Sequence, residues 1–465
     1  MRFRTLTLTL MIALTGVAGW LRSADAGRAQ SQRRAEVTFN KDVAPIFFEH
    51  CVSCHRPGEA APMSLLTWRE ARPWARAIRE KVAARQMPPW HADPRVNEYA
   101  NDRRLGEKEI ATIVAWADQG AIEGAPRDLP PQPRFVEGWR AGEPDVVIAL
   151  PEEFTVPAEG PDEYHYFDAP TNFTEDKWVQ AAEVRPGNRR VVHHATVFVA
   201  PPKGPSFADA RDWDFWNKYV YDSGHLLHLR QEAPVFDDGC GLPEGGAWPG
   251  LKPDEGPQVG IYLPGKGPDI RPPGYAVKVP AGASLRFQVH YTKTGQPEKD
   301  RTRIGLIFAK GPAKRQVKRV EIWNNLFKIP PFAGNHRVTS CYTFDHAVEA
   351  LSFTAHMHYR GKAMKVEAFY PDGRREVVFS APNYSFNWQT TYVLKRPQPF
   401  PKGTRIFTVA HFDNSAKNKL NPDPGKTIRW GEPSGEEMMG LWIEYVDANQ
   451  SPLAPPAPPL LRRKP

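Results

Sequence analysis

The sequence has no long run of basic residues and, after residue 21, no apolar run long enough to cross a membrane. Its 61 Lys and Arg residues outnumber its 53 Asp and Glu residues, but they are scattered, so the net charge of +8 forms no stripe. Scattered charge of this kind does not indicate nucleic-acid binding. We therefore expect a protein that binds no nucleic acid and whose body has no membrane span.

The N-terminus is the one strongly apolar stretch. "MRFR" is a positive n-region, "TLTLTLMIALTGVAGWL" is an apolar h-region, and "ADA" ends at Ala26 as a small-x-small cleavage site. This pattern predicts a signal peptide over 1–26 and a periplasmic or secreted protein. The alternative is an uncleaved h-region that anchors the protein in a membrane.

Proline is abundant, with 48 residues spread along the chain, and this favours loop-rich β structure over helix. From about residue 143, short β-prone runs alternate with Pro/Gly turns, as in "VVHHATVFVA" and "SLRFQVHYT". This alternation predicts antiparallel all-β sandwiches. About 300 residues are long for one sandwich, so we expect two, over 143–298 and 299–450. The Pro-rich tail over 451–465 is predicted to be disordered.

The segment 36–123 has helical spacing of apolar residues instead, and a Pro-rich linker over 124–142 follows it. This segment contains "CVSCH", a C-x-x-C-H sequence formed by Cys51, Cys54 and His55. Two thiols at this spacing reach both vinyl groups of a porphyrin, and the adjacent histidine then ligates the iron. We therefore predict a small all-α cytochrome c-like domain with one covalently attached haem.

Two methionines compete for the second axial position of that haem. Met87 in "RQMPPW" precedes the last predicted helix and is favoured over Met63 in "APMSL". A half zinc site is the alternative reading of the motif, but zinc requires a second Cys/His pair, and the segment has none. The remaining cysteines, Cys240 and Cys341, are free to form a disulfide in an oxidising compartment.

Histidines recur in three of the predicted strands. "VVHHATVF" carries His193 and His194, and "FQVHYT" carries His290. Adjacent residues on a regular strand point to opposite faces. His193 and His194 therefore share an ion only at a strand end, at a bulge, or through different ring nitrogens. "FTAHMHYRG" carries His356 and His358, whose i, i+2 spacing places both on one face of a strand.

A thioether follows in "GEEMMGLW", where Met438 is favoured over Met439. Imidazole ligands suit zinc, copper, iron or nickel, and an added thioether favours copper. The pattern thus predicts two sites, an all-nitrogen group of His193, His194 and His290 and an N₂S group of His356, His358 and Met438.

In this order, "VVHH", "LRFQVHYT", "TAHMHYRGK" and "GEEMMGLW" resemble the copper type II, ascorbate-dependent monooxygenases, the family of dopamine β-monooxygenase and peptidylglycine α-hydroxylating monooxygenase. The resemblance covers about 185–446. It implies two jelly-roll-like sandwiches with one copper ion each. It also implies that the N₂S group is the catalytic, oxygen-binding site and that the all-nitrogen group transfers electrons.

The chain departs from the peptide-processing members of that family at two positions. Thr354 stands where they carry an arginine for the substrate carboxylate, and Trp442 stands where they carry a tyrosine. Peptide amidation is therefore not expected.

The expected function is an exported monooxygenase that hydroxylates a C–H bond of a small substrate with O₂. Its electrons come from an ascorbate-like reductant or another cytochrome, and the fused haem is the expected relay. The alternative is a non-catalytic protein that binds copper and transfers electrons, because fold resemblance alone does not establish activity.

Overall fold

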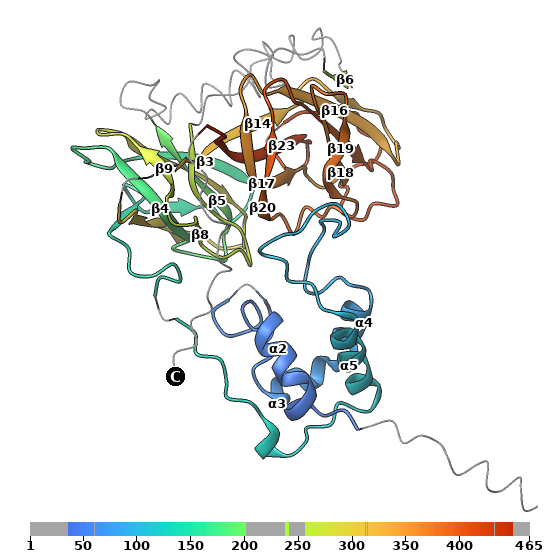
Figure 1. Cartoon of the computed structure of the whole chain (residues 1–465). Helices are drawn as coiled ribbons and strands as arrows, with labels where there is room; N and C mark the ends of the chain where they lie inside the picture. Colours follow the sequence, from blue (N-terminus) through green and yellow to red (C-terminus); the bar gives the residue numbers. More distant parts are fainter. Residues whose placement is uncertain are drawn as a thin grey trace, which may run out of the picture. The chain divides into compact units, whose positions relative to one another are not determined.

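The computed structural model describes residues 36–200, 238–240 and 256–449, except for positions 60, 137, 161, 312, 314 and 432 (Figure 1). Of the described residues, 38% lie in strands and 12% in helices, so the chain is β-rich. The predicted signal peptide and the predicted disordered tail lie outside the described residues. In the described part, no helix is both long and apolar enough to cross a membrane.

The prediction of a small all-α cytochrome c-like domain is wrong. The α-helices ahead of the sheets are short, and turns, single helical turns of other types and irregular segments separate them. Prolines contribute to this irregularity, because "MPPW" directly after the α4 region cannot continue a helix. The α-helices are α2 (Ala44–His50), α3 (Trp68–Ala71), α4 (Ala75–Ala83) and α5 (Glu107–Asp118); the shorter turns are η1 (Phe39–Val43), η2 (Arg72–Trp74) and η3 (Pro126–Asp128).

Residues 36–57, 61–88 and 105–133 form one compact unit around an aromatic core. The rings of Phe39, Phe47 and Trp116 lie 5.9–6.2 Å apart in tilted and edge-on contacts. α3 begins with a capping box, in which Thr67 and Glu70 each bond the other's backbone N–H.

The other compact unit comprises residues 58–59, 89–104 and the described residues from 134 onward, and it contains two pairs of packed sheets. The first sheet pair encloses one core of buried apolar side chains contributed by both of its sheets. One sheet has the order β1 (Val146–Ala149), β12 (Arg303–Phe308), β4 (Lys177–Arg185), β9 (Tyr275–Val279), β13 (Arg315–Gln316), with β8 (Asp269–Ile270) beside β4; the other has the order β3 (Glu163–Pro170), β10 (Ser284–Tyr291), β5 (Val192–Ala200), β7 (Gln258–Tyr262); β2 (Phe154–Val156) pairs with β11 (Glu298–Asp300).

The second sheet pair encloses a second core of the same kind. One sheet has the order β14 (Lys318–Trp323), β23 (Gly440–Asp447), β17 (Val348–His356), β20 (Tyr392–Phe400); the other has the order β19 (Arg375–Ala381), β18 (Gly361–Phe369), β21 (Arg405–Phe412), β16 (His336–Thr343), β6 (Asp238–Gly239); β15 (Lys328–Ile329) pairs with β22 (Ile428–Arg429).

Residues 89–104 lie along the edge strand β20, although they fall between α4 and α5 in the sequence. Tyr99 forms an isolated β-bridge with Leu394, and the rings of Trp90 and Tyr99 pack on Tyr392 at 5.0 and 5.6 Å. This segment therefore covers an edge that would otherwise expose unpaired backbone groups.

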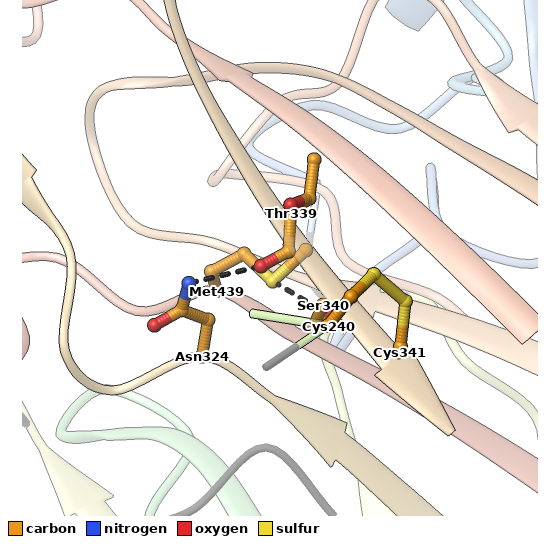
Figure 2. The surroundings of a disulfide bond; sticks show 6 residues. All are labelled: Cys240, Asn324, Thr339, Ser340, Cys341 and Met439. Atoms are coloured by element: carbon orange, nitrogen blue, oxygen red, sulfur yellow. Dashed lines mark hydrogen bonds between the residues drawn. A yellow bond between two sulfur atoms is a disulfide. The ribbon is translucent and has the colours of Figure 1, made fainter. Parts of the chain in front are cut away.

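The predicted disulfide between Cys240 and Cys341 is confirmed (Figure 2). Their Cα atoms lie 4.7 Å apart, and the bond closes a separation of 101 residues. β6, just before Cys240, pairs in parallel with β16, which carries Cys341. The bond therefore fastens a short strand to the edge of the second sheet pair.

Candidate metal centres

The first candidate centre comprises His193 and His194 on β5 and His290 on the neighbouring strand β10. One ring nitrogen from each residue lies within 4.8 Å of the others. In the strand register His290 faces His194, whereas Tyr291 faces Val192, so His193 has no residue opposite it. His193 is thus the extra residue of a β-bulge, which lets adjacent histidines point to one place.

His194 and His290 are buried, His193 is partly buried, and the environment disfavours the charged form of His193 and His194. His290 is fully buried and His194 is 7% exposed. Burial, followed by the charge of His290, lowers the pKa of His193 to about 4 and that of His194 well below its usual value. Neutral imidazole is the form that binds a metal ion.

The hydrogen-bonding state of His290 fits a metal ligand. Neither of its ring nitrogens makes a hydrogen bond among the described residues. Its Nε2 lies 3.3 Å from an Asp162 carboxylate oxygen, but that contact lacks hydrogen-bond geometry. A buried polar atom without a partner is costly, and a metal ion would satisfy it.

The second candidate centre lies where β17 ends and β23 begins. His356 is the last residue of β17 and faces Gly440, the first residue of β23, so Met438 is carried close to it. The distance from His356 Nε2 to Met438 Sδ is 3.3 Å. His358 lies just past the strand end, with its ring centroid 5.2 Å from that of His356. The two histidines therefore come together, although a regular strand does not carry both.

The neighbouring methionine has a different contact. Met439 Sδ accepts a hydrogen bond of 3.4 Å from the Ser340 hydroxyl on β16, next to the disulfide (Figure 2). Met439 is fully buried. Of the two candidate thioethers, Met438 is the one that contacts a histidine.

Hydrogen bonds to Nδ1 orient both rings of the second centre. Gln389 Oε1 lies 2.6 Å from Nδ1 of His356, and the Glu436 carbonyl lies 3.3 Å from Nδ1 of His358. An acceptor at Nδ1 places the proton there and leaves Nε2 as the ligand atom. The His358 Nε2 atom is buried and makes no hydrogen bond among the described residues, so it also fits a ligand role.

The backbone between these two histidines is held as well. Tyr384 Oη contacts both backbone polar atoms of Met357, at 3.0 Å from its N and 2.5 Å from its O. Glu437 accepts the backbone N–H groups of His358 and Arg360 at 2.8 and 2.6 Å. Burial raises the pKa of Glu437 to about 8, although these N–H groups oppose the shift.

Phe386 packs between the two centres. Its ring stacks on His193, with centroids 5.5 Å apart and planes at 13°, and meets His358 edge-on at 5.8 Å. Phe386 is 5% exposed. His194 from the first centre and His356 and Met438 from the second also line one cavity. The two centres are therefore neighbours joined by packed side chains.

Sequence reasoning missed Tyr384, Phe386 and Gln389. All three lie in the segment between β19 and β20, which has no hydrophobic period and no motif. Nothing in the residue order indicates that this loop reaches β17. Only the fold reveals these contacts.

The C-x-x-C-H sequence lies in the turn directly after α2. His55 N–H donates to the Cys51 carbonyl at 2.9 Å, and its Nδ1 lies 3.3 Å from the Met63 carbonyl, which leaves Nε2 as the potential ligand atom. Burial, then the neighbouring Cys54, raises the pKa of the Cys51 thiol to about 12. Met87 is 41% exposed. Haem attachment stays a prediction that rests on the motif.

Comparisons with known proteins do not classify the chain. No family model matches it, and no curated protein matches it. Among solved structures, it is similar to the VP2 subviral particle of infectious bursal disease virus, at 9% identity over 66% of this chain and 74% of that one, with a TM-score of 0.18. A structure of the Gx strain of the same virus gives 8% identity over 66% of this chain and 73% of that one, also with a TM-score of 0.18. Scores this low carry no argument about fold or function.

Proposed function

We propose that this chain is a copper-dependent monooxygenase that hydroxylates a C–H bond of a small molecule with O₂. The observation that carries the proposal is the 3.3 Å contact between His356 Nε2 and Met438 Sδ beside a separate all-histidine group. A thioether favours a soft, redox-active ion such as Cu(I), whereas zinc sites use cysteine, histidine and carboxylates.

Two differently built sites also favour catalysis over simple copper carriage. When bound, copper supplies one-electron redox chemistry and activation of O₂ at the N₂S group. The residues of the chain supply the rest. Gln389 and the Glu436 carbonyl hold the ligand tautomers, and the Phe386 ring contacts one histidine of each group.

Hydroxylation consumes two electrons, and the chain carries a candidate source for them. In this proposal Cys51 and Cys54 would hold a haem, with His55 as a ligand, and the haem would supply one-electron transfer from an external donor. The motif alone supports this part, since the expected cytochrome-like fold is wrong.

The test is metal analysis combined with EPR and O₂ uptake on the purified full chain. We expect two type II copper ions per chain and copper-dependent O₂ consumption with a reductant. Met438→Ala should lose O₂ consumption, whereas Met439→Ala should keep it, because Met439 sulfur contacts Ser340 and not a histidine. If the protein binds two copper ions but neither consumes O₂ nor forms a hydroxylated product, it is instead an electron-transfer or copper-binding protein.

A further inference from the structure

A cavity lies beside the two centres, and both sheet pairs contribute to its wall. Its empty space is about 620 Å³ when the space open to solvent is counted with it. Much of that wall is apolar or aromatic, formed by Tyr164, Phe198, Ile261, Leu263, Trp323 and Trp442. Walls of this kind are typical of sites for molecules with an apolar body.

Arg319 carries the only permanent charge among the described residues that line the cavity. Other protein groups already contact its guanidinium. One terminal nitrogen lies 2.7 Å from Glu321, and the other donates to Gln258. The guanidinium also lies over the Trp442 ring, 4.5 Å from its centroid. The Arg319 side chain is 6% exposed. Its charge is therefore compensated before any ligand arrives.

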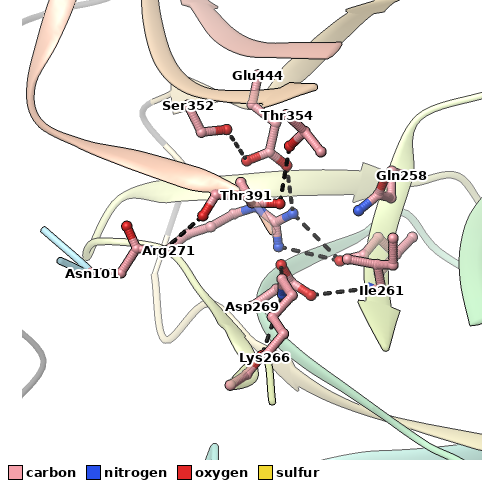
Figure 3. A network of polar contacts seen from close by, with 12 residues as sticks. Asn101, Gln258, Ile261, Lys266, Asp269, Arg271, Ser352, Thr354, Thr391 and Glu444 are labelled. Atoms are coloured by element: carbon pink, nitrogen blue, oxygen red, sulfur yellow. Dashed lines mark hydrogen bonds and ion pairs between the residues drawn. The ribbon is translucent and has the colours of Figure 1, made fainter. Parts of the chain in front are cut away.

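The charges next to the cavity wall are compensated in the same way (Figure 3). Arg271 lies 3.4 Å from Glu444, which also accepts a hydrogen bond from Ser352 at 3.2 Å. Lys266 pairs with Asp269 at 2.6 Å, and that aspartate accepts the backbone N–H of Ile261. No charge in this network is left for a ligand ion.

Two buried donors in the cavity wall lack an acceptor. The Nε of Arg319 and the indole Nε1 of Trp442 make no hydrogen bond among the described residues. The Thr354 hydroxyl, in contrast, is bonded to Thr391 at 3.1 Å. Both atoms are covered by protein, so an oxygen acceptor on a bound molecule would satisfy them once their side chains turn toward the cavity.

We propose that the cavity binds an uncharged organic substrate with an aromatic or apolar body and an oxygen that accepts hydrogen bonds, and that it rejects carboxylates and ammonium ions. This inference rests on the proposed function, because it names the substrate class of that site. An ion that enters this cavity would lose hydration and would find no charged group that is still without a partner of opposite charge. An uncharged oxygen loses less and gains the two free donors.

A matched set of three probes tests the charge preference: 4-methylbenzyl alcohol, 4-methylbenzoate and 4-methylbenzylammonium. Binding to the full chain is measured by saturation-transfer NMR titration, both without copper and with Cu(I) in the absence of O₂. The alcohol should bind at least tenfold more tightly than either ion. Equal or tighter binding of an ion, or no binding of the alcohol, would overturn the proposal.

Paired variants test the site and the donor. Trp442→Phe removes one unbonded donor and should weaken binding of the alcohol about fivefold. Trp430→Phe should leave it unchanged, because that indole N–H is also buried and unbonded but does not line the cavity. Leu263→Trp fills the cavity and should abolish binding, whereas Val147→Trp adds the same ring at an exposed position. Equal effects within either pair would place the probe elsewhere and refute the assignment.

The binding assay separates this inference from the proposed function. If the alcohol binds selectively but no copper-dependent O₂ uptake occurs, the substrate class stands and the monooxygenase proposal fails. If O₂ uptake occurs but a carboxylate or ammonium probe binds best, the substrate class fails and the monooxygenase proposal stands.

Discussion

Gln389 should control the copper affinity of the centre formed by His356, His358 and Met438 and should leave the copper affinity of the other centre unchanged. Its Oε1 lies 2.6 Å from Nδ1 of His356 and thereby directs Nε2 of that ring toward Met438. Gln389→Leu removes the acceptor at similar volume. The buried Nδ1–H is then unpaired, or the ring turns and protonates the ligand atom. An unpaired buried donor costs about 1–3 kcal/mol, and loss of such an outer partner typically costs about 10–100-fold in metal affinity. The two magnitudes agree, because 10–100-fold corresponds to about 1.4–2.8 kcal/mol.

The assay is an anaerobic Cu(I) titration against a chromophoric chelator, which resolves two binding steps. Gln389→Leu should weaken the step assigned to His356, His358 and Met438 by about 10–100-fold and leave the other step unchanged. Gln389→Glu keeps an acceptor oxygen and should recover most of the affinity. Gln398→Leu is the matched control, because Gln398 lies on β20 of the same sheet pair and its amide bonds Tyr370, not a histidine. Unchanged affinity at the step assigned to His356, His358 and Met438, or an equal loss at both steps, would refute the reasoning.

Three further outcomes are expected. Phe386→Leu should weaken both Cu(I) steps in the same titration, because the ring contacts one histidine of each centre; a change confined to one step contradicts this. Cys51→Ala combined with Cys54→Ala should remove covalently bound haem, measured as the pyridine haemochrome of the denatured protein; a wild-type protein without covalent haem would end that prediction. Cys240→Ser combined with Cys341→Ser should lower the free energy of unfolding in urea by up to about 4.7 kcal/mol, the chain-entropy value for a loop of roughly 100 residues; an unchanged unfolding midpoint would show that the bond constrains little.

The positions of strands could be predicted from the sequence, because apolar and polar residues alternate along a strand with a fixed period of two. The runs around "VVHHATVFVA" and "SLRFQVHYT" became β5 and β10, and they pair with each other. The same argument allowed His193 and His194 to converge at a strand end, at a bulge or through different ring nitrogens, and the register contains a bulge at His193. The capping box of Thr67 and Glu70 is local in the same way, because its two residues lie three positions apart.

What failed depends on contacts between distant segments. Helical spacing in 36–123 predicted an all-α domain, yet residues 89–104 pack on β20 and join the sheets. Asn40 in η1 depends on a distant segment in the same way, because it is buried and its amide donates to the Gly124 and Ala125 carbonyls at 3.2 Å. Both outcomes reflect partners more than 80 residues away, which no local pattern encodes.

Both candidate centres form where strand regularity fails. At His193 the bulge removes a residue from the ladder, and at His356 the strand ends, so each ligand is free to turn toward its partners. A regular strand would hold these imidazoles a fixed pleat apart and on faces set by alternation. The cost of this freedom is that the ladder no longer positions the rings. The loop between β19 and β20 takes over that task through Tyr384, Phe386 and Gln389. Metal affinity should therefore respond more strongly to substitutions in this loop than to substitutions of equal size in the cores of the sheet pairs.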